Sequence, residues 1–141
     1  MSEKPGEERF GQSYYDRYYL NKATRVATPA YYRRLATFLA AYSAYLDIRV
    51  NRVLDIGCGV GGLKSPLLAA FSRAEYVGIE HSQHACAKYG WQNGCASTYH
   101  SPKSFDLVIC HDVLQYLDAE LADKALAEFG SFNQYILYFS M

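Results

Sequence analysis

A glycine-rich segment follows the apolar run at residues 53–56 and carries the clearest chemical signal in the 141-residue sequence. Gly57, Gly59 and Gly62 have the spacing G-x-G-x-x-G, and Glu80 lies 21 residues beyond Gly59. In a mononucleotide-binding β-α-β unit, such glycines let the backbone approach a ligand closely, and a carboxylate at this distance binds ribose hydroxyls. The sequence therefore predicts a site for an adenosine-containing cofactor.

The charge beside the glycines narrows the choice of cofactor. Asp55 precedes Gly57 by two positions and lies at the mouth of the glycine turn. A dinucleotide would place a pyrophosphate dianion at the helix N-terminus, where the amides attract it but the Asp55 carboxylate would repel it. A ligand that carries ammonium and sulfonium charges suits this carboxylate. S-adenosylmethionine is such a ligand.

Short apolar runs alternate with helical segments along most of the chain. The expected strands, bounded by turn residues, are 52–56, 76–80, 105–110 and 135–139, with a weaker one at 94–98. The expected helices are 29–46, 61–72, 82–89 and 119–129. Strands buried on both faces read as continuous apolar runs. The alternation predicts an α/β fold with a doubly wound, mostly parallel sheet and helices on both faces.

Three segments resemble motifs of the class I S-adenosylmethionine-dependent methyltransferases. V-L-D-I-G-C-G-V-G at residues 53–61 is similar to their first motif, and V-G-I-E at residues 77–80 resembles their ribose-binding strand end. F-D-L-V at residues 105–108, with V-L-Q-Y-L at residues 113–117, resembles their fourth motif. The resemblance covers residues 52–140 and implies a Rossmann-like sheet in the strand order 3-2-1-4-5.

The resemblance also implies roles for individual residues. Glu80 should accept both ribose hydroxyls, and Gly57 and Gly59 should lie against the methionine portion of the cofactor. Asp55 should hold its ammonium group, directly or through water. His111, just past the fourth strand, should lie where the methyl group meets its acceptor and is the candidate catalytic base, unless it merely packs at a helix entry. The remaining expected cofactor contacts are Cys58, His81, Ser97, Tyr14 and Tyr18.

Two features depart from the family pattern. Members usually offer an acidic or polar residue after the third strand for the adenine amino group, whereas residues 94–97 are Gly-Cys-Ala-Ser. Adenine recognition is then expected to fall to Ser97 or to backbone groups. The chain also stops at Met141 without the family's sixth and seventh strands. We therefore expect either a truncated piece of a longer enzyme or an exposed fifth-strand edge that a second copy covers.

The amino-terminal segment has the most unusual composition. Residues 10–45 contain eight of the 14 tyrosines, and the stretch is rich in basic residues. We expect a helical cap at residues 10–48, in which Tyr14 and Tyr18 contact the sulfonium or the substrate by cation–π interaction and stacking. Two alternatives remain, namely nucleic-acid binding by the aromatic and basic side chains, and a helix that only packs its tyrosines on the sheet.

Composition and charge exclude several classes of protein. The 14 basic and 14 acidic side chains balance, which argues against disorder and against binding to nucleic acid by overall charge. No apolar run approaches the roughly 20 residues of a membrane span, and residues 1–6 lack the apolar region of a secretory signal. The cysteines and histidines lack metal-binding spacings, so no metal is expected. The sequence predicts one cytoplasmic domain, with a frayed end at residues 1–9 and a cofactor-binding core at residues 49–141.

The predicted function is methyl transfer from S-adenosylmethionine to a small-molecule acceptor. A nicotinamide-dependent oxidoreductase is the first alternative, disfavoured by Asp55 and by the 79 residues that follow Gly62, too few for a second nucleotide half and a substrate domain. A cofactor-binding or scaffold protein without turnover is the second. An RNA-modifying methyltransferase is the third, disfavoured because no N-P-P-Y signature follows the fourth strand.

Overall fold

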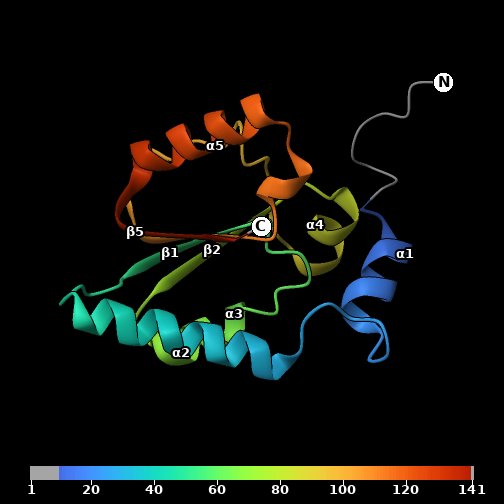
Figure 1. Ribbon diagram of the computed structural model, residues 1–141, viewed down its shortest axis with the longest axis horizontal. Helices are drawn as coiled ribbons and strands as arrows, with labels where there is room; N and C mark the ends of the chain where they lie inside the picture. The colour runs from blue at the N-terminus through green and yellow to red at the C-terminus, as the bar shows by residue number, and fades with distance from the viewer. Residues whose placement is uncertain (1–9, 141) are drawn as a thin grey trace.

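The computed structural model describes residues 10–140 of the chain. Its centre is a five-stranded sheet in the order β3-β2-β1-β4-β5, in which all neighbouring strands are parallel (Figure 1). The strands are β1 Arg52–Ile56, β2 Glu75–Glu80, β3 Gln92–Asn93, β4 Phe105–His111 and β5 Asn133–Ser140. The predicted α/β class is confirmed, and so is the strand order that the family resemblance implies.

Helices cover both faces of the sheet. They are α1 Gln12–Tyr15, the π-helix η1 Asp16–Leu20, α2 Pro29–Tyr45, α3 Lys64–Ala70, α4 Gln83–Tyr89, the 3-10 helix η2 Leu114–Tyr116 and α5 Ala119–Phe132. Figure 1 shows α5 above the sheet and α2 with α3 below it. Thr28 begins α2 by accepting a hydrogen bond from the amide of Tyr31 at 3.1 Å, directly before the proline at the first helical position. None of the helices within residues 10–140 is long and apolar enough to cross a membrane.

The two central strands are buried on both faces. Leu54 and Val108 belong to the core cluster that contains Phe129 of α5. Their neighbours Val53 and Leu107 point the opposite way, into the cluster formed with α2 and α3. Each of these strand side chains is at most 1% exposed. Burial on both faces explains why residues 53–54 of β1 and 107–110 of β4 are apolar without alternation, since neither face tolerates a polar side chain without a partner. The buried exception in β1, Asp55, has such a partner in the Tyr76 hydroxyl.

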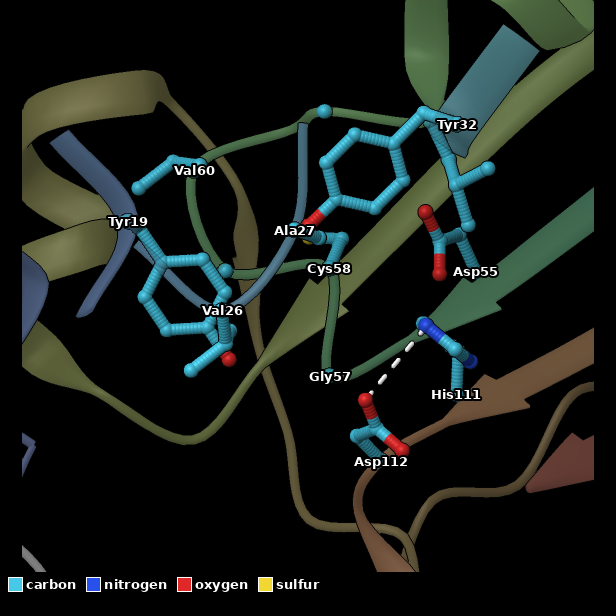
Figure 2. Close-up of a pocket in the computed structure, with 13 residues that line it drawn as sticks. Tyr19, Val26, Ala27, Tyr32, Asp55, Gly57, Cys58, Val60, His111 and Asp112 are labelled. Carbon is cyan, nitrogen blue, oxygen red and sulfur yellow. Dashed lines mark ion pairs between the residues drawn. The ribbon is translucent and has the colours of Figure 1, made fainter. Parts of the chain in front are cut away.

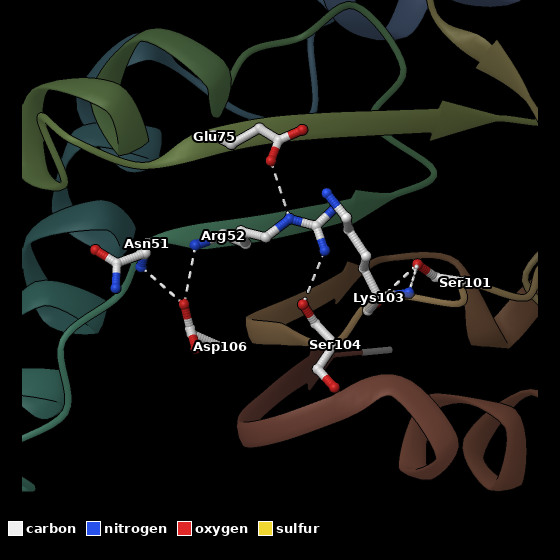
Figure 3. A network of polar contacts seen from close by, with 7 residues as sticks. All are labelled: Asn51, Arg52, Glu75, Ser101, Lys103, Ser104 and Asp106. Carbon is white, nitrogen blue, oxygen red and sulfur yellow. Dashed lines mark hydrogen bonds and ion pairs between the residues drawn. The ribbon is translucent and has the colours of Figure 1, made fainter.

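A polar network fixes the register of the sheet at the amino ends of its central strands (Figure 3). Asp106 of β4 accepts hydrogen bonds from the amides of Asn51 and Arg52, at 2.8 and 3.0 Å. The Arg52 guanidinium donates to the Glu75 carboxylate and to the Ser104 carbonyl, both at 2.9 Å. These contacts hold β1, β2 and β4 level with one another, so that their carboxyl ends meet at the opposite edge.

The third strand differs from the prediction. The predicted strand at residues 94–98 is wrong, because only Gln92–Asn93 join the sheet and residues 96–98 form a turn. Gly90 ends α4 in the left-handed conformation, with φ 76°, and the chain enters the sheet directly after Trp91. Gln92 and Asn93 are exposed, so this strand has no apolar pattern that a sequence reading could find.

We call α1, η1 and α2 together the cap. α1 and η1 lie beside the carboxyl edge of the sheet, whereas α2 packs on the face that it shares with α3. The first described residue, Phe10, accepts a hydrogen bond from the Ser82 hydroxyl at 2.7 Å, which attaches the cap to the start of α4. Tyr15 is 4% exposed and contacts the glycine turn, since its ring lies 3.6 Å from where a Cβ of Gly59 would be. The frayed end predicted at residues 1–9 lies outside the described residues.

Candidate active site

The turn after β1 depends on glycine. Gly57, Gly59 and Gly61 have φ values of 70°, 56° and 77°, in the left-handed region that side chains disfavour. A Cβ on Gly57 would also lie only 2.3 Å from Cγ2 of Val113. The Gly57 amide donates to the Ile79 carbonyl at 2.9 Å, which ties the turn to β2. The turn thus presents backbone without side chains of its own at these positions.

Glu80 ends β2 and holds the glycine turn with its carboxylate. Oε2 accepts a hydrogen bond from the Gly59 amide at 2.8 Å, and Oε1 accepts one from the Ser82 amide at 3.0 Å. The residue is 7% exposed. An ionised carboxylate offers about four acceptor positions. The hydroxyl donors of a ligand would use the remaining positions, as the predicted ribose contact requires, beside the Tyr15 hydroxyl that also interacts with this carboxylate.

Asp55 is a buried carboxylate at the end of β1. It is 2% exposed, and Oδ2 accepts a hydrogen bond from the Tyr76 hydroxyl at 2.6 Å. Burial raises the pKa of Asp55 to about 7, the Tyr76 hydrogen bond opposes this shift, and the negative charge of Glu80 adds to it. A cation that entered the cleft would favour the ionised carboxylate.

A cleft opens between the glycine turn, the cap and the end of β4 (Figure 2). The space among its lining residues measures about 450 Å³, including the part that is open to solvent. Tyr19 and Tyr32 of the cap line it from one side, and His111 and Asp112 line it from the other. Two carboxylates, Asp55 and Asp112, face the cleft, and none of the 13 described residues that line it is lysine or arginine. The cleft suits a positively charged ligand.

His111 lies at the centre of a small polar group beside the cleft. Its Nδ1 is 2.6 Å from the hydroxyl oxygen of Ser140, its register partner on β5. Its Nε2 is 3.3 Å from the Tyr31 hydroxyl and 3.4 Å from Oδ2 of Asp112. Burial lowers the pKa of His111, and the Asp112 carboxylate opposes this shift. The ring is therefore a neutral imidazole at neutral pH, able to accept a proton.

A family model described as a methyltransferase domain matches residues 54–132, more than half of the chain. The chain belongs to this methyltransferase family. The match includes the glycine turn, Glu80 and His111, and it confirms the resemblance drawn from the sequence motifs.

Relatives of this methyltransferase domain are longer than the chain itself. A ubiquinone biosynthesis O-methyltransferase of Rickettsia felis is 29% identical in an alignment 85 residues long that covers 54% of this chain and 35% of that protein. Among solved structures, an S-adenosylmethionine-dependent methyltransferase from Clostridium acetobutylicum aligns with a TM-score of 0.68 and 21% identity, over 89% of this chain and 53% of that one. CalS10, an amino pentose methyltransferase from Micromonospora echinaspora, aligns with a TM-score of 0.66 and 19% identity, over 77% and 50%. The two structures share the fold, and the chain spans about a third to a half of these relatives.

The methyltransferase domain brings only part of the predicted site together. The predicted residues that line the cleft are Asp55, Gly57, Cys58, Gly59 and His111. Glu80 is attached to the same turn through Gly59, and His81 follows it at an exposed position. Ser97 is 3% exposed, with its hydroxyl 3.4 Å from the Cys95 sulfur.

Tyr14 and Tyr18 lie in the cap but are not among the residues that line the cleft. Tyr14 belongs to an aromatic cluster in which its hydroxyl is 3.3 Å from that of Tyr116. The Tyr18 ring lies 5.2 Å from the Tyr14 ring and 5.2 Å from the Arg17 guanidinium carbon. Two other tyrosines of the cap, Tyr19 and Tyr32, line the cleft.

Three further residues of the site escaped the sequence analysis. Trp91, directly before β3, donates from Nε1 to the Gly59 carbonyl at 2.8 Å and supports the glycine turn. Tyr31 and Ser140 contact the two ring nitrogens of His111. Ser140 had a signal in the sequence, because the predicted fourth and fifth strands are parallel and their carboxyl ends meet. Tyr31 and Trp91 had none, since long-range packing alone places them.

Proposed function

We propose that this methyltransferase domain binds S-adenosylmethionine in the cleft beside the glycine turn and transfers its methyl group to a small-molecule acceptor. One observation carries the proposal: the cleft beside a left-handed glycine turn is lined by Asp55 and Asp112 and by no described lysine or arginine. When bound, the cofactor supplies an electrophilic methyl group on a positively charged sulfur. The same carboxylates would repel the pyrophosphate of a nicotinamide dinucleotide, since no lysine or arginine stands among the described lining residues to balance its charge.

Each part of the cofactor has a proposed partner. Glu80 accepts the ribose hydroxyls with the acceptor positions that Gly59 and Ser82 leave free. Asp55 holds the ammonium group, and Gly57 and Gly59 let the methionine portion approach the backbone. The further contacts proposed from the sequence are Cys58, His81, Ser97, Tyr14 and Tyr18.

The proposed acceptor enters beside His111 and Asp112, at the carboxyl ends of the strands where open α/β sheets bind ligands. Methyl transfer needs no protonation of the leaving thioether, so catalysis rests on positioning the two reactants and excluding water. Tyr19 and Tyr32 serve this by covering the cleft. The name of the Rickettsia relative, which concerns ubiquinone biosynthesis, and that of CalS10, which concerns an amino pentose, support a small-molecule acceptor.

The location and assembly proposed from the sequence also have structural support. Cys58, Cys86, Cys95 and Cys110 are free thiols, which suits a reducing compartment such as the cytoplasm. β5 forms one edge of the described sheet, and a homo-oligomer through this edge is proposed. Light scattering tests it: a mass of 15.9 kDa at all concentrations means that the edge does not self-associate.

A two-part experiment tests the proposed function. Thermal shift with S-adenosylmethionine, S-adenosylhomocysteine and a nicotinamide dinucleotide identifies the cofactor, and we expect stabilisation by the first two only. Transfer of a labelled methyl group to the small-molecule, RNA and protein fractions of a cell extract then identifies the acceptor class. Stabilisation by the dinucleotide alone contradicts the proposal. Cofactor binding without transfer to any fraction favours the non-catalytic alternative, and label in RNA favours the nucleic-acid alternative.

A further inference from the structure

The hydroxyl of Ser140 fixes the tautomer of His111. A serine hydroxyl donates one hydrogen bond and accepts two. The Asp112 amide can only donate, so Ser140 accepts from it at 3.3 Å. The Asp112 carboxylate can only accept when ionised, so the Ser140 hydrogen points to Oδ1, also at 3.3 Å. The third contact, at 2.6 Å to His111 Nδ1, is therefore one in which the ring donates, and Nδ1 carries the hydrogen.

With its hydrogen on Nδ1, the neutral ring of His111 has a lone pair on Nε2. The Tyr31 hydroxyl lies 3.3 Å from Nε2, in position to donate a hydrogen bond to it, and the two rings stack at 5.6 Å between centroids. His111 lines the cleft, and its side chain is 12% exposed. The lone pair therefore faces the place where an acceptor would enter, and a hydroxyl group already approaches it there.

We propose that the methyl acceptor is a neutral hydroxyl compound, an alcohol or a phenol, and that His111 Nε2 takes its proton during transfer. This inference rests on the proposed function. The acceptor hydroxyl takes the place of the Tyr31 hydroxyl on Nε2. As the acceptor oxygen forms a bond to the methyl carbon, the bond from that carbon to sulfur breaks, its electron pair stays on sulfur, and the hydroxyl proton moves to Nε2.

A hydroxyl acceptor is favoured because it gains more than other acceptors when His111 removes its proton. Thiols and carboxylic acids ionise readily near neutral pH. An alkyl ammonium loses its proton before it attacks, and a neutral aryl amine attacks with a free lone pair and loses its proton afterwards. An alcohol or phenol is mostly un-ionised at neutral pH, so its attack gains most from removal of the proton in the transition state. Nε2, which is free of hydrogen, supplies that assistance.

Asp112 completes the arrangement. Its Oδ2 lies 3.4 Å from Nε2, so the imidazolium that forms after proton transfer meets a carboxylate at once. Asp112 has φ 54°, a left-handed conformation in which Ser140 holds both its amide and its carboxylate. The charged or titratable groups that face His111 are Asp112, Tyr31 and Tyr138, whose ring centroid is 6.2 Å away. Ser140 and Asp112 are thus positioning residues, and His111 is the catalytic residue.

The test compares benzene-1,2-diol with benzene-1,2-diamine, two acceptors of similar size and shape, using labelled S-adenosylmethionine and the whole chain. We expect transfer to the diol, with kcat lowered about 100-fold or more in His111→Ala. Ser140→Ala should lower kcat with little change in KM, and Ser140→Thr, which keeps the hydroxyl, should restore it. Asp112→Asn, which also tolerates the left-handed conformation, should move the acid limb of the kcat profile to lower pH, because the carboxylate raises the pKa of His111.

Two results overturn the proposal. One is transfer to the diamine at a rate at least equal to that of the diol and unchanged in His111→Ala. The other is a hydrogen on Nε2 of His111, measured by ¹⁵N NMR of the ring without any acceptor. This measurement tests the proposal even if neither compound is methylated. A hydrogen on Nδ1 that Ser140→Ala redistributes supports the proposal. Calorimetry with S-adenosylmethionine separates the failure of the proposed function from the failure of the base. If the unaltered chain does not bind the cofactor, the proposed function is refuted. If it binds the cofactor but carries the His111 hydrogen on Nε2, only the role of His111 as base is refuted.

Discussion

Asp55→Asn should stabilise the folded chain at alkaline pH while weakening cofactor binding. The carboxyl group is buried, and its pKa rises from 3.8 to about 7 on folding, chiefly because of burial. Between these values the folded chain keeps a proton that the unfolded chain has lost. The free energy of unfolding should therefore fall as the pH rises from about 4 to about 7.

The size of this effect follows from the same pKa difference. At about 1.4 kcal/mol per pH unit, the ionised carboxylate costs the folded chain about 4 kcal/mol above pH 7. Asparagine removes the charge and keeps a carbonyl oxygen for the Tyr76 hydroxyl, which now donates to Asp55 Oδ2. The variant should be more stable than the unaltered chain by a few kcal/mol at about pH 8, and similar to it at about pH 4.

Urea unfolding at several pH values, followed by circular dichroism, measures this prediction. Asp123→Asn is the matched control, because Asp123 is exposed on α5, and it should leave the pH dependence of the unaltered chain in place. The reasoning is refuted if Asp55→Asn and the unaltered chain follow parallel curves, or if the variant is the less stable protein at about pH 8. A gain in stability together with weaker cofactor binding is the pattern expected of a residue kept for function.

The remaining predictions concern the glycine turn. Glu80→Ala should lower the affinity for S-adenosylmethionine at least tenfold in calorimetry, and an unchanged dissociation constant refutes the ribose role. The same change should lower the free energy of unfolding in urea by about 2–5 kcal/mol, because the Gly59 and Ser82 amides lose their acceptor. Gly57→Ala should destabilise the fold by about 1–3 kcal/mol, because Gly57 has a positive φ and the added Cβ would clash with the Val113 side chain. Gly130→Ala, at a helical site where the added Cβ has open space, should stabilise the fold by up to about 1 kcal/mol. Equal effects of the two glycine changes, measured by thermal unfolding, contradict the account of the turn.

Much of the fold could be predicted because the central strands are buried on both faces. Such strands are apolar without alternation, as at residues 53–54 and 107–110, and the glycines that follow β1 mark where it ends. β3 could not be predicted, because its two exposed polar residues join the sheet through backbone bonds such as that from the Gly94 amide to the Glu80 carbonyl, at 3.0 Å. Backbone pairing at a sheet edge demands little of the side chains.

The same distinction applies to the site. The positions of Asp55, the glycines and Glu80 around one turn could be predicted, since these positions depend on spacing along one β-α-β unit. Tyr19 and Tyr32 reach the cleft only because the cap folds back over the sheet, so the sequence shows an excess of tyrosines but not which of them face the cleft. The partners of His111 likewise come from α2 and β5, and only the three-dimensional arrangement brings them to its two nitrogens.

A crystal structure of the chain with S-adenosylhomocysteine, the demethylated product, tests the central claim most directly. We predict the product in the cleft beside the glycine turn, with its ribose hydroxyls on the Glu80 carboxylate and its ammonium group within direct or water-mediated reach of Asp55. The thioether sulfur should face the side of the cleft that His111 and Asp112 line. A product bound elsewhere, or one whose ribose makes no contact with Glu80, would contradict the account.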